Sequence, residues 1–536
     1  MSAETTLARA ITEQLARLGV DAPADAVQLS RPQRPEHGDW STNVALILYK
    51  QAERRPRDLA EELAGALRDS TIEHVEAIEV AGPGFINFKL SPRWLHDILR
   101  EVVAGGETGY ASPDLGRGER VQIEFVSANP TGPLHVGNGW FASYGDALGR
   151  IMSRAGWKVQ REYYVNDTGG QIRALGESIL ARRRGESVPE GGYQGAYVAE
   201  LAEQYDGPEE VVAAGRFAAD RILDNIKETL EQIHVRFDEW YSQASIEESG
   251  QVADTIAFLR RQGHVYEEDG AVWLRSTAFG DTRDRVLVKS NGDATYLAGD
   301  LAYHRDKFLV RGFDRVINVW GADHHGQVAS IKAGVEALGV EPGRLEVRLG
   351  QLISLVGHRM SKRAGIYVPL SDLIQILGAD AARLVTLLAS IDQATTLDLD
   401  RLTAESAENP VYYVQYAHAR IASIDRVAAE RGIARVPIEA TDLSLLTHPR
   451  ELDVLRSLVE LPRVVTDAAL ERAPYKVTNW VRSLAAAFHG FYHDCYVMGE
   501  DVPPELTQAR LWLVEAARIG LAIGLGLLGV DAPEQM

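Results

Sequence analysis

The 536-residue sequence predicts an α/β protein with a strand-turn-helix-strand unit in its central part, an α+β domain before it and an all-helical domain after it. Three observations support this prediction. Apolar and polar residues alternate along 121–125, as in a strand. Apolar residues then recur at three- and four-residue spacing along 137–155, as in a helix. From residue 408 to the end the pattern is helical, with one loop near 432–448.

The composition is that of an ordinary globular protein, with 45% apolar and 25% charged residues. A net charge of -20 argues against general nonspecific binding of nucleic acids, although a local basic surface is enough for one RNA. The single cysteine, Cys495, excludes a disulfide framework within the chain and a cysteine-based zinc site, and it fits a reducing cytoplasm. The most apolar run, 519–530, is too short and too rich in glycine to span a bilayer, so we expect no membrane association.

Mixed helices and strands predict a first domain over residues 1–100, which ends in the strand 84–90. Glycine, serine and proline accumulate along 101–118, which predicts a linker. The central domain is predicted over 119–400, with a charged helical insertion at about 181–270. The remainder, 401–536, forms the helical domain.

The strand at 121–125 runs into Asn129-Pro-Thr-Gly-Pro133, and the predicted helix begins just after His135. This turn places His135, Gly137 and Asn138 at a helix N-terminus, where unpaired amide groups and the helix dipole favour a phosphate. The extended run 157–165 completes the β-turn-α-β unit. The arrangement outlines an ATP site.

Here the chain resembles a known family. The segment 128–138, Ala-Asn-Pro-Thr-Gly-Pro-Leu-His-Val-Gly-Asn, resembles the His-Ile-Gly-His signature of class I aminoacyl-tRNA synthetases in the form found in arginyl-tRNA synthetases. Far downstream, 359–363 (Arg-Met-Ser-Lys-Arg) resembles the Lys-Met-Ser-Lys-Ser loop. Two signatures in this order imply a Rossmann-like class I catalytic domain. One position departs from the pattern, because Asn138 stands where the second histidine usually does.

The resemblance implies how ATP is bound and activated. It assigns catalysis to His135 and Lys362, at opposite ends of the triphosphate. It assigns ATP binding to the residues of both signatures, which are His135, Gly137, Asn138, Met360, Ser361 and Lys362. Magnesium would accompany ATP, and we expect no structural metal in the protein. The closely spaced Asp323, His324 and His325 suggest a metal ligand set, but adjacent histidines on one turn point in different directions.

For the amino acid, the resemblance implies a pocket suited to a guanidinium, which binds carboxylates in a fixed fork. Glu124 and Asp300 would meet the guanidinium or amino group, Asn129 the carboxylate, and Tyr296 would form a wall, with Asp323 nearby. Taken alone, Asp300 could instead be a helix N-cap.

Contacts with tRNA are implied at both ends of the chain. In the first domain Phe85 would stack on a base of the D-loop and Asn87 would read its edge, although Asn87 could equally be one polar residue of a strand. In the helical, anticodon-binding domain Tyr412, Tyr416 and Arg420 offer stacking faces and charge, and some of these aromatic side chains could be core instead.

The resemblance implies ligation of arginine to tRNA(Arg) through arginyl-adenylate, with ATP, arginine and tRNA(Arg) as partners. We expect the protein to be a cytoplasmic monomer. Two alternatives stay open. One is a paralogue that adenylates arginine for another acceptor, against which the presence of both tRNA-facing domains argues. The other is a noncatalytic tRNA-binding module, which Asn138 favours and Lys362 disfavours.

Overall fold

The computed structural model describes residues 3–23, 26–32, 34–356, 368–403 and 409–536. The chain forms two compact units, each built from three stretches of sequence. Unit 1 comprises Met1–Gly105, Ala428–Val459 and Gly490–Ala517. Unit 2 comprises Gly106–Val427, Glu460–His489 and Arg518–Met536.

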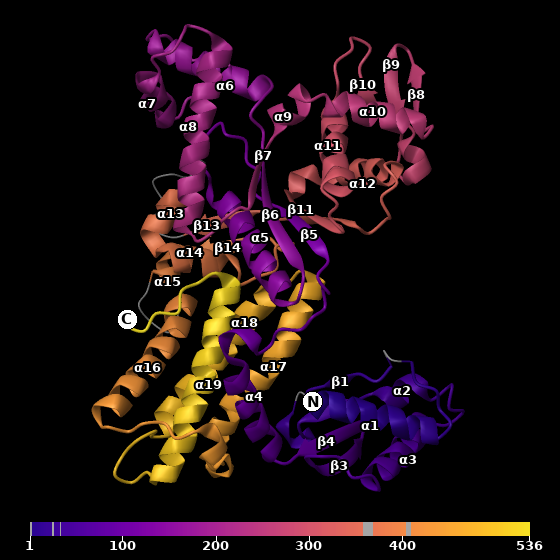
Figure 1. Ribbon diagram of the computed structural model, residues 1–536, viewed down its shortest axis with the longest axis vertical. Helices are drawn as coiled ribbons and strands as arrows, with labels where there is room; N and C mark the ends of the chain where they lie inside the picture. Colours follow the sequence, from indigo (N-terminus) through magenta and orange to yellow (C-terminus); the bar gives the residue numbers. More distant parts are fainter. Residues whose placement is uncertain (1–2, 24–25, 33, 357–367, 404–408) are drawn as a thin grey trace. The chain divides into compact units, whose positions relative to one another are not determined.

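The N-terminal part of unit 1 is an α+β fold around an antiparallel sheet of order β1-β2-β4-β3 (Figure 1). Its elements are β1 (Leu29–Ser30), β2 (Trp40–Thr42), β3 (Val75–Ala81), β4 (Phe85–Leu90), α1 (Ala3–Arg17), α2 (Val44–Leu48) and α3 (Pro56–Arg68). Helix α1 has an apolar stripe, Leu7, Ile11 and Leu15, that is buried in this core. Helix α4 (Arg93–Gly109) extends into the segment predicted as a linker and is interrupted at Gly106, where φ is 56°.

The centre of unit 2 is a parallel sheet of order β12-β11-β5-β6-β7 (Figure 1). Its strands are β5 (Arg120–Glu124), β6 (Lys158–Val165), β7 (Glu239–Ser242), β11 (Arg315–Gly321) and β12 (Leu345–Gly350). The chain runs from β5 outward to β7 and then returns to the other side of β5 with β11. The strand order therefore reverses between β5 and β11, and ligands bind at the carboxyl ends of the strands at such a point. This confirms the predicted Rossmann-like fold.

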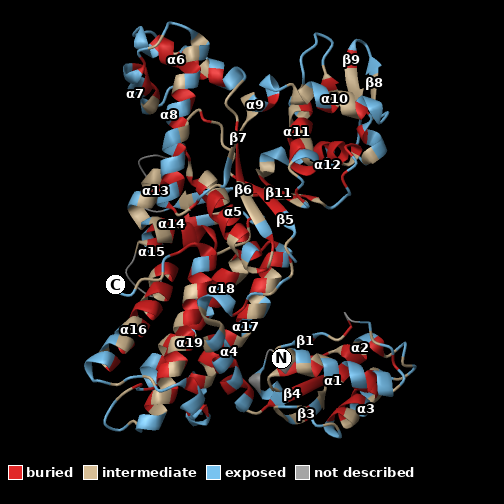
Figure 2. Cartoon of the chain, in the orientation of Figure 1, coloured by how far each residue is buried: buried red, intermediate tan, exposed pale blue. Residues whose placement is uncertain are grey.

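Helix α5 (Val136–Arg154) joins β5 to β6 and packs on the sheet. It is among the most buried helices of the unit, as the red colour in Figure 2 shows. Gly145 allows the close approach, because a Cβ at this position would overlap the ring of Phe125. The position of α5 fixes the turn that precedes it.

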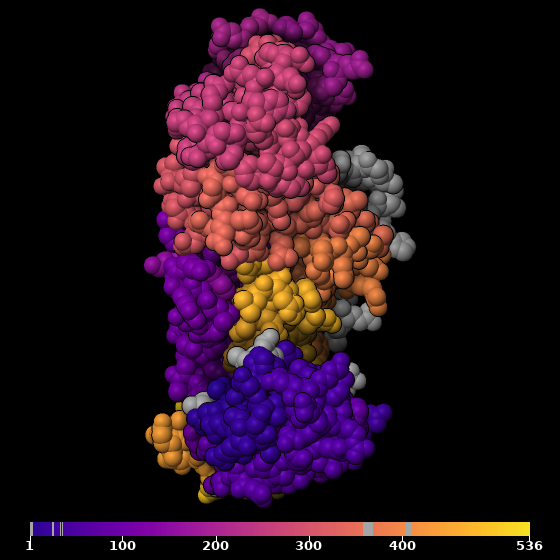
Figure 3. All heavy atoms as spheres, turned by 90° about the vertical axis from the view of Figure 1, so that its right-hand side faces the viewer, coloured from indigo at the N-terminus to yellow at the C-terminus, as the bar shows by residue number. Residues whose placement is uncertain are grey.

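Further elements of unit 2 lie outside this sheet. Helices α6 (Gly170–Arg183), α7 (Ala196–Gln204) and α8 (Val211–Gln232) pack together, and α9 (Gln243–Glu248), α10 (Gln251–Arg261), α11 (Tyr296–Arg305) and α12 (Val328–Ala337) follow. A second sheet is antiparallel and contains β8 (Val265–Glu268), β9 (Ala271–Leu274) and β10 (Arg285–Val288). The second sheet and the helices next to it in sequence, α10 and α11, form the pink surface in Figure 3. The segment predicted as a helical insertion, 181–270, therefore also contains the strands β7 and β8. The sequence did not reveal them, because four residues are too few to show a strand period.

Two short strands, β13 (Ile353–Val356) and β14 (Thr395–Asp398), pair in parallel, and α13 (Leu370–Leu377), α14 (Ala379–Thr386) and α15 (Leu399–Leu402) lie near them in sequence. The C-terminal part is helical, as predicted: α16 (Pro410–Glu430), α17 (Pro449–Glu471), α18 (Tyr475–Asp494) and α19 (Pro504–Leu528). By length and composition α19 is the one described helix that could cross a membrane, yet 72% of its most apolar window is buried within the protein. A core helix has the same properties.

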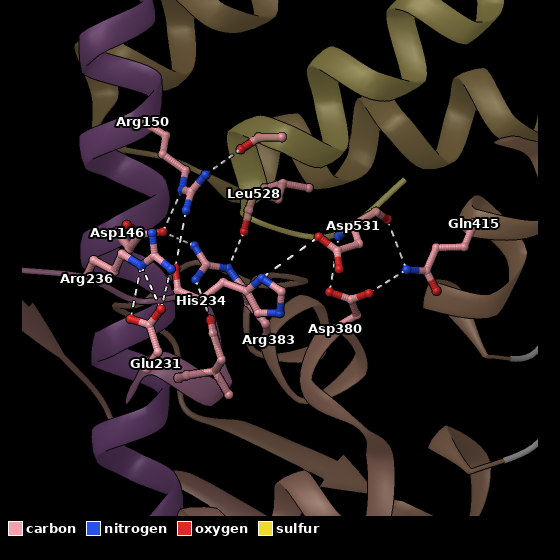
Figure 4. Close-up of polar contacts among 12 residues, drawn as sticks. Asp146, Arg150, Glu231, His234, Arg236, Asp380, Arg383, Gln415, Leu528 and Asp531 are labelled. Atoms are coloured by element: carbon pink, nitrogen blue, oxygen red, sulfur yellow. Dashed lines mark hydrogen bonds and ion pairs between the residues drawn. The ribbon is translucent and has the colours of Figure 1, made fainter. Parts of the chain in front are cut away.

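Arg383 links four helices inside unit 2 (Figure 4). Its guanidinium is fully buried and donates to the Asp146 carboxylate on α5, to the Leu528 carbonyl on α19, and to the Ile233 carbonyl after α8 at 2.8 Å. Burial opposes ionisation of Asp146, but the surrounding arginines hold the pKa of this carboxyl below its usual value. Gly529 leaves room for Arg383, since a Cβ there would overlap the guanidinium.

Candidate active site

A cavity of about 1890 Å³ lies at the carboxyl ends of β5, β6 and β11, where the strand order reverses. The start of α5 and one face of α11 complete its walls. Every predicted ATP- or arginine-binding residue that the structure describes lines this cavity: Glu124, Asn129, His135, Gly137, Asn138, Tyr296, Asp300 and Asp323. The fold therefore brings together residues up to 200 positions apart in sequence.

His135 and Asn138 cap the N-terminus of α5 reciprocally. The backbone amide of Asn138 donates to His135 Nδ1 at 3.3 Å, and the backbone amide of His135 donates to Asn138 Oδ1 at 3.0 Å. This is a capping box. Because Nδ1 accepts a hydrogen bond, the ring proton of neutral His135 is on Nε2. Burial lowers the pKa of His135, which favours this neutral form.

The turn after β5 has an unusual backbone that orients Glu124. Val126 and Ser127 have φ values of 68° and 39°, a region that a β-branched residue rarely adopts. The Ser127 hydroxyl donates to Glu124 Oε1 at 3.1 Å and accepts from the Tyr164 amide at 3.1 Å. Strain of this kind persists where surrounding contacts enforce it, commonly at functional sites.

Helix α11 presents Asp300, Tyr303 and His304 to the cavity. Its N-cap is Thr295, whose hydroxyl accepts from the Ala298 amide at 3.4 Å, so Asp300 is not the N-cap. Burial, and then the charge of Glu124, raise the pKa of Asp300 to about 7, while Lys307 acts in the opposite direction. Asp300 therefore titrates near neutral pH in the protein without substrate.

The other predicted arginine-binding residues lie toward the opening. Asn129 donates to Gln171 Oε1 at 2.5 Å, Tyr296 is 87% exposed, and Asp323 is exposed on the short helix η4 (Ala322–Gln327). A bound ligand would cover more of these side chains than of Glu124, which is already buried.

Sequence reasoning missed the buried Lys307, which donates to Glu124 Oε2 at 2.6 Å. It also missed Tyr164, Tyr303 and His304 in the cavity wall. The sequence held a weak signal, because Asp300, Tyr303, His304 and Lys307 recur at three- and four-residue spacing.

Met360, Ser361 and Lys362 lie outside the described residues, which stop at Val356 and resume at Val368. Both of these flanking residues line the cavity. The second flank is paired with the signature turn, because the Val136 amide donates to the Val368 carbonyl at 3.1 Å and the Leu370 amide to the Leu134 carbonyl at 2.8 Å. The described residues on both sides of the second signature therefore lie at the cavity.

The predicted tRNA-binding side chains of α16 lie together in unit 2. Tyr412 and Tyr416 stack with centroids 5.5 Å apart, and Arg420 lies over the Tyr416 ring at 4.3 Å. All three are half-buried, which leaves part of each surface accessible. In unit 1, Phe85 is 41% exposed, whereas Asn87 is 7% exposed.

Within the described part of the chain, His234, Asp380 and Asp531 form the one group of three or more potential metal ligands close enough to share an ion (Figure 4). None of them lines the cavity. Both oxygens of Asp380 already accept hydrogen bonds, from Gln415 at 2.7 Å and from the Asp531 amide at 3.1 Å.

Comparison with known proteins agrees with this geometry. Residues 102–423 match the family of class I (R) tRNA synthetase catalytic domains. The chain belongs to the arginyl-tRNA synthetases. Residues 5–90 match the arginyl tRNA synthetase N-terminal domain, and 414–536 match the DALR anticodon-binding domain.

This arginyl-tRNA synthetase is also similar to curated relatives over nearly the whole length of both chains. The arginine–tRNA ligase of Frankia alni is 46% identical and that of Moorella thermoacetica 43% identical, each over at least 98% of both chains. The solved structure of Thermus thermophilus arginyl-tRNA synthetase aligns with a TM-score of 0.80 over 99% of this chain and all of the other. At 24% identity this likeness shows the fold.

Proposed function

We propose that this protein ligates arginine to tRNA(Arg) in two steps, as the relatives named arginine–tRNA ligase imply. The carboxylate of arginine attacks the α-phosphate of ATP, which gives arginyl-adenylate and releases pyrophosphate. The terminal ribose hydroxyl of tRNA then attacks the adenylate, which gives arginyl-tRNA and releases AMP. The observation that carries the proposal is that one cavity is lined both by a helix N-terminus suited to binding phosphate and by the carboxylates of Glu124 and Asp300.

On the ATP side, the N-terminus of α5 offers amide groups and the neutral Nε2–H donor of His135. Such donors stabilise charge that grows on the phosphates without giving up a proton. Lys362 would supply a positive charge for the leaving pyrophosphate. This role is supported by Val356 and Val368, the described residues on either side of the segment that contains Lys362, because both line the cavity.

Magnesium would be carried by ATP. Among the described residues the cavity has no group of three or more acidic, histidine or cysteine ligands close enough to share an ion, so the triphosphate oxygens would hold it.

On the amino-acid side, the buried Glu124 and the partly buried Asp300 give the cavity floor the negative charge that a guanidinium needs. Tyr296 and Asn129, nearer the opening, would order when arginine covers them. Removing one acceptor leaves a desolvated guanidinium partly unpaired, at a cost of about 1 to 3 kcal/mol.

Asn138 fits an active site. Its Oδ1 closes the capping box with His135, so the asparagine maintains the helix start that binds phosphate. Its side-chain amide leaves two N–H donors, whereas a neutral histidine has one donor and one acceptor. The substitution therefore alters the hydrogen-bonding pattern and preserves the turn.

For tRNA, we propose that Phe85 contacts the D-loop and that Tyr412, Tyr416 and Arg420 form a stacking surface on α16. The ordered aromatic pair and the overlying guanidinium support the second assignment. Asn87 is buried, so Phe85 is the better candidate of that pair. We further propose a cytoplasmic monomer made of the four parts at 1–100, 101–118, 119–400 and 401–536.

Arginine-dependent exchange of labelled pyrophosphate into ATP, with and without tRNA(Arg), tests the proposal. We expect exchange with arginine and not with lysine, and formation of arginyl-tRNA when tRNA(Arg) is present. Exchange without transfer to tRNA would identify an adenylating paralogue, and tRNA binding without exchange would identify a noncatalytic module.

A further inference from the structure

Lys307 is a buried cation directly behind the acidic floor of the cavity. Its side chain has no exposed surface, and Nζ donates to Glu124 Oε2 at 2.6 Å and to Asn318 Oδ1 at 3.3 Å. Nζ also lies 4.0 Å from the centroid of the Tyr303 ring. Lys307 is not among the residues that line the cavity, so it can act on a substrate only through its neighbours.

Lys307 lies in an unusual backbone conformation. Helix α11 ends at Arg305, and the next five residues, Asp306–Val310, form a π-helical turn. Single π turns are rare and are found frequently at functional sites. Asn318, which also contacts Lys307, is on β11 next to β5, so the ammonium group lies where the strand order reverses.

The charge of Lys307 acts on both acids of the floor. It is paired with Glu124, and it opposes the effects of burial and of Glu124 that raise the pKa of Asp300. A second buried acid, Glu162, accepts a hydrogen bond from Tyr303 and is paired with Arg311. Three other titratable groups in this part of the cavity wall are neutral at pH 7. Burial, aided by Lys307, lowers the pKa of His304 to about 3, and burial raises the pKa of Tyr164 and Tyr303.

We propose that Lys307 is a positioning residue for amino-acid selection, which fixes the Glu124 carboxylate and neutralises one of the two floor acids. The floor then retains the charge that matches one guanidinium. The inference rests on the proposed function, because it takes Glu124 and Asp300 as the acids that meet arginine. Without Lys307, Glu124 and Asp300 would share the cavity without this cation, and one of them would keep a proton up to higher pH.

Isothermal titration of arginine between pH 6 and 8.5 tests this inference in the full-length protein. In wild type, arginine binding should strengthen with pH up to a midpoint near 7, as Asp300 ionises. In Lys307→Met the midpoint should rise by about one pH unit, with binding about fivefold weaker at pH 7. Lys307→Arg should keep the wild-type midpoint, and ATP binding should be unchanged in both variants.

A second pair of variants covers the case in which Lys307→Met does not fold. Glu124→Gln/Lys307→Met removes both members of the ion pair, and such replacements are often tolerated. Its midpoint should be higher than that of Glu124→Gln alone, because Lys307 no longer stabilises the Asp300 carboxylate. Equal midpoints in this pair, or an unshifted midpoint in folded Lys307→Met, would overturn the inference. A wild-type protein that binds no arginine at any pH would instead overturn the proposed function.

Discussion

At the residue scale, Asp300 makes arginine affinity depend on pH. Its pKa is about 7 without substrate, and a bound guanidinium favours the carboxylate form. Binding therefore releases a proton below this pKa, and the dissociation constant should rise about tenfold per pH unit below 7 and level off above it. Asp300→Asn should weaken arginine binding and remove this pH dependence. Calorimetry in buffers of different ionisation enthalpy measures the proton release, and none at pH 6.5 would contradict the assignment.

Asn138 provides a test of the departure from the family signature. Asn138→Ala removes the side-chain half of the capping box, and it also removes the amide donors. Asn138→His can still accept from the His135 amide. We expect the steady-state rate of adenylation to fall more in Asn138→Ala than in Asn138→His. An inactive wild type that Asn138→His restores would instead indicate a paralogue with decayed catalysis.

Lys362 should act mainly in the transition state, because charge grows on the leaving pyrophosphate. Lys362→Ala should raise the activation free energy of single-turnover adenylation by about 2 to 4 kcal/mol and change the free energy of ATP binding far less. Rapid-quench measurement with saturating ATP and arginine separates these effects. A single-turnover rate equal to that of wild type would remove Lys362 from the mechanism.

At the element scale, the contact between β5 and α5 fixes the signature turn. Gly145→Ala should shift α5 or the Phe125 ring, since the added Cβ would overlap that ring. Overpacking costs about 1 to 3 kcal/mol, which exceeds the gain of roughly 0.5 to 1 kcal/mol from removing a helical glycine. We therefore expect a lower melting temperature together with weaker ATP binding.

Gly526→Ala is the matched control for Gly145→Ala. Gly526 is exposed on α19 in the same unit, and a Cβ added there would have no neighbouring atom within 4 Å outside its own helix turn. This substitution should raise stability slightly and leave ATP binding unchanged. If both variants behave alike in thermal denaturation, close packing of α5 on β5 does not determine stability.

At the scale of the whole molecule, the Arg383 network connects distant parts of the sequence within unit 2. Arg383→Met leaves the Asp146 carboxylate with fewer cations and two buried carbonyl groups without their donor. Breaking a buried pair in this way should cost about 3 kcal/mol or more. Arg463→Met is the control, because Arg463 pairs with Asp467 on the surface at 3.6 Å, where such a pair contributes roughly 0 to 1 kcal/mol. Urea denaturation compares the two variants, and equal losses would contradict this role.

Much of the site was predictable because its residues belong to short local patterns. His135, Gly137 and Asn138 form one turn between a strand and a helix, and a turn of this type creates a phosphate site wherever it occurs. Lys307 was not predictable in the same way. A lysine in a helical pattern is usually solvated, and its burial follows from a π turn and from the approach of β5 and β11, which are nearly 200 residues apart.

By itself the sequence determined the class of fold, the order of its α+β, α/β and helical parts, and the place of the phosphate-binding turn, because side-chain period and turn chemistry act over a few residues. Only the tertiary structure decided which strands are neighbours, and therefore which acids share one cavity. It also decided the protonation of Asp300, since burial and the nearby charges of Glu124 and Lys307 depend on contacts across the sheet. Distances between strands that are far apart in the chain cannot be inferred from local sequence patterns.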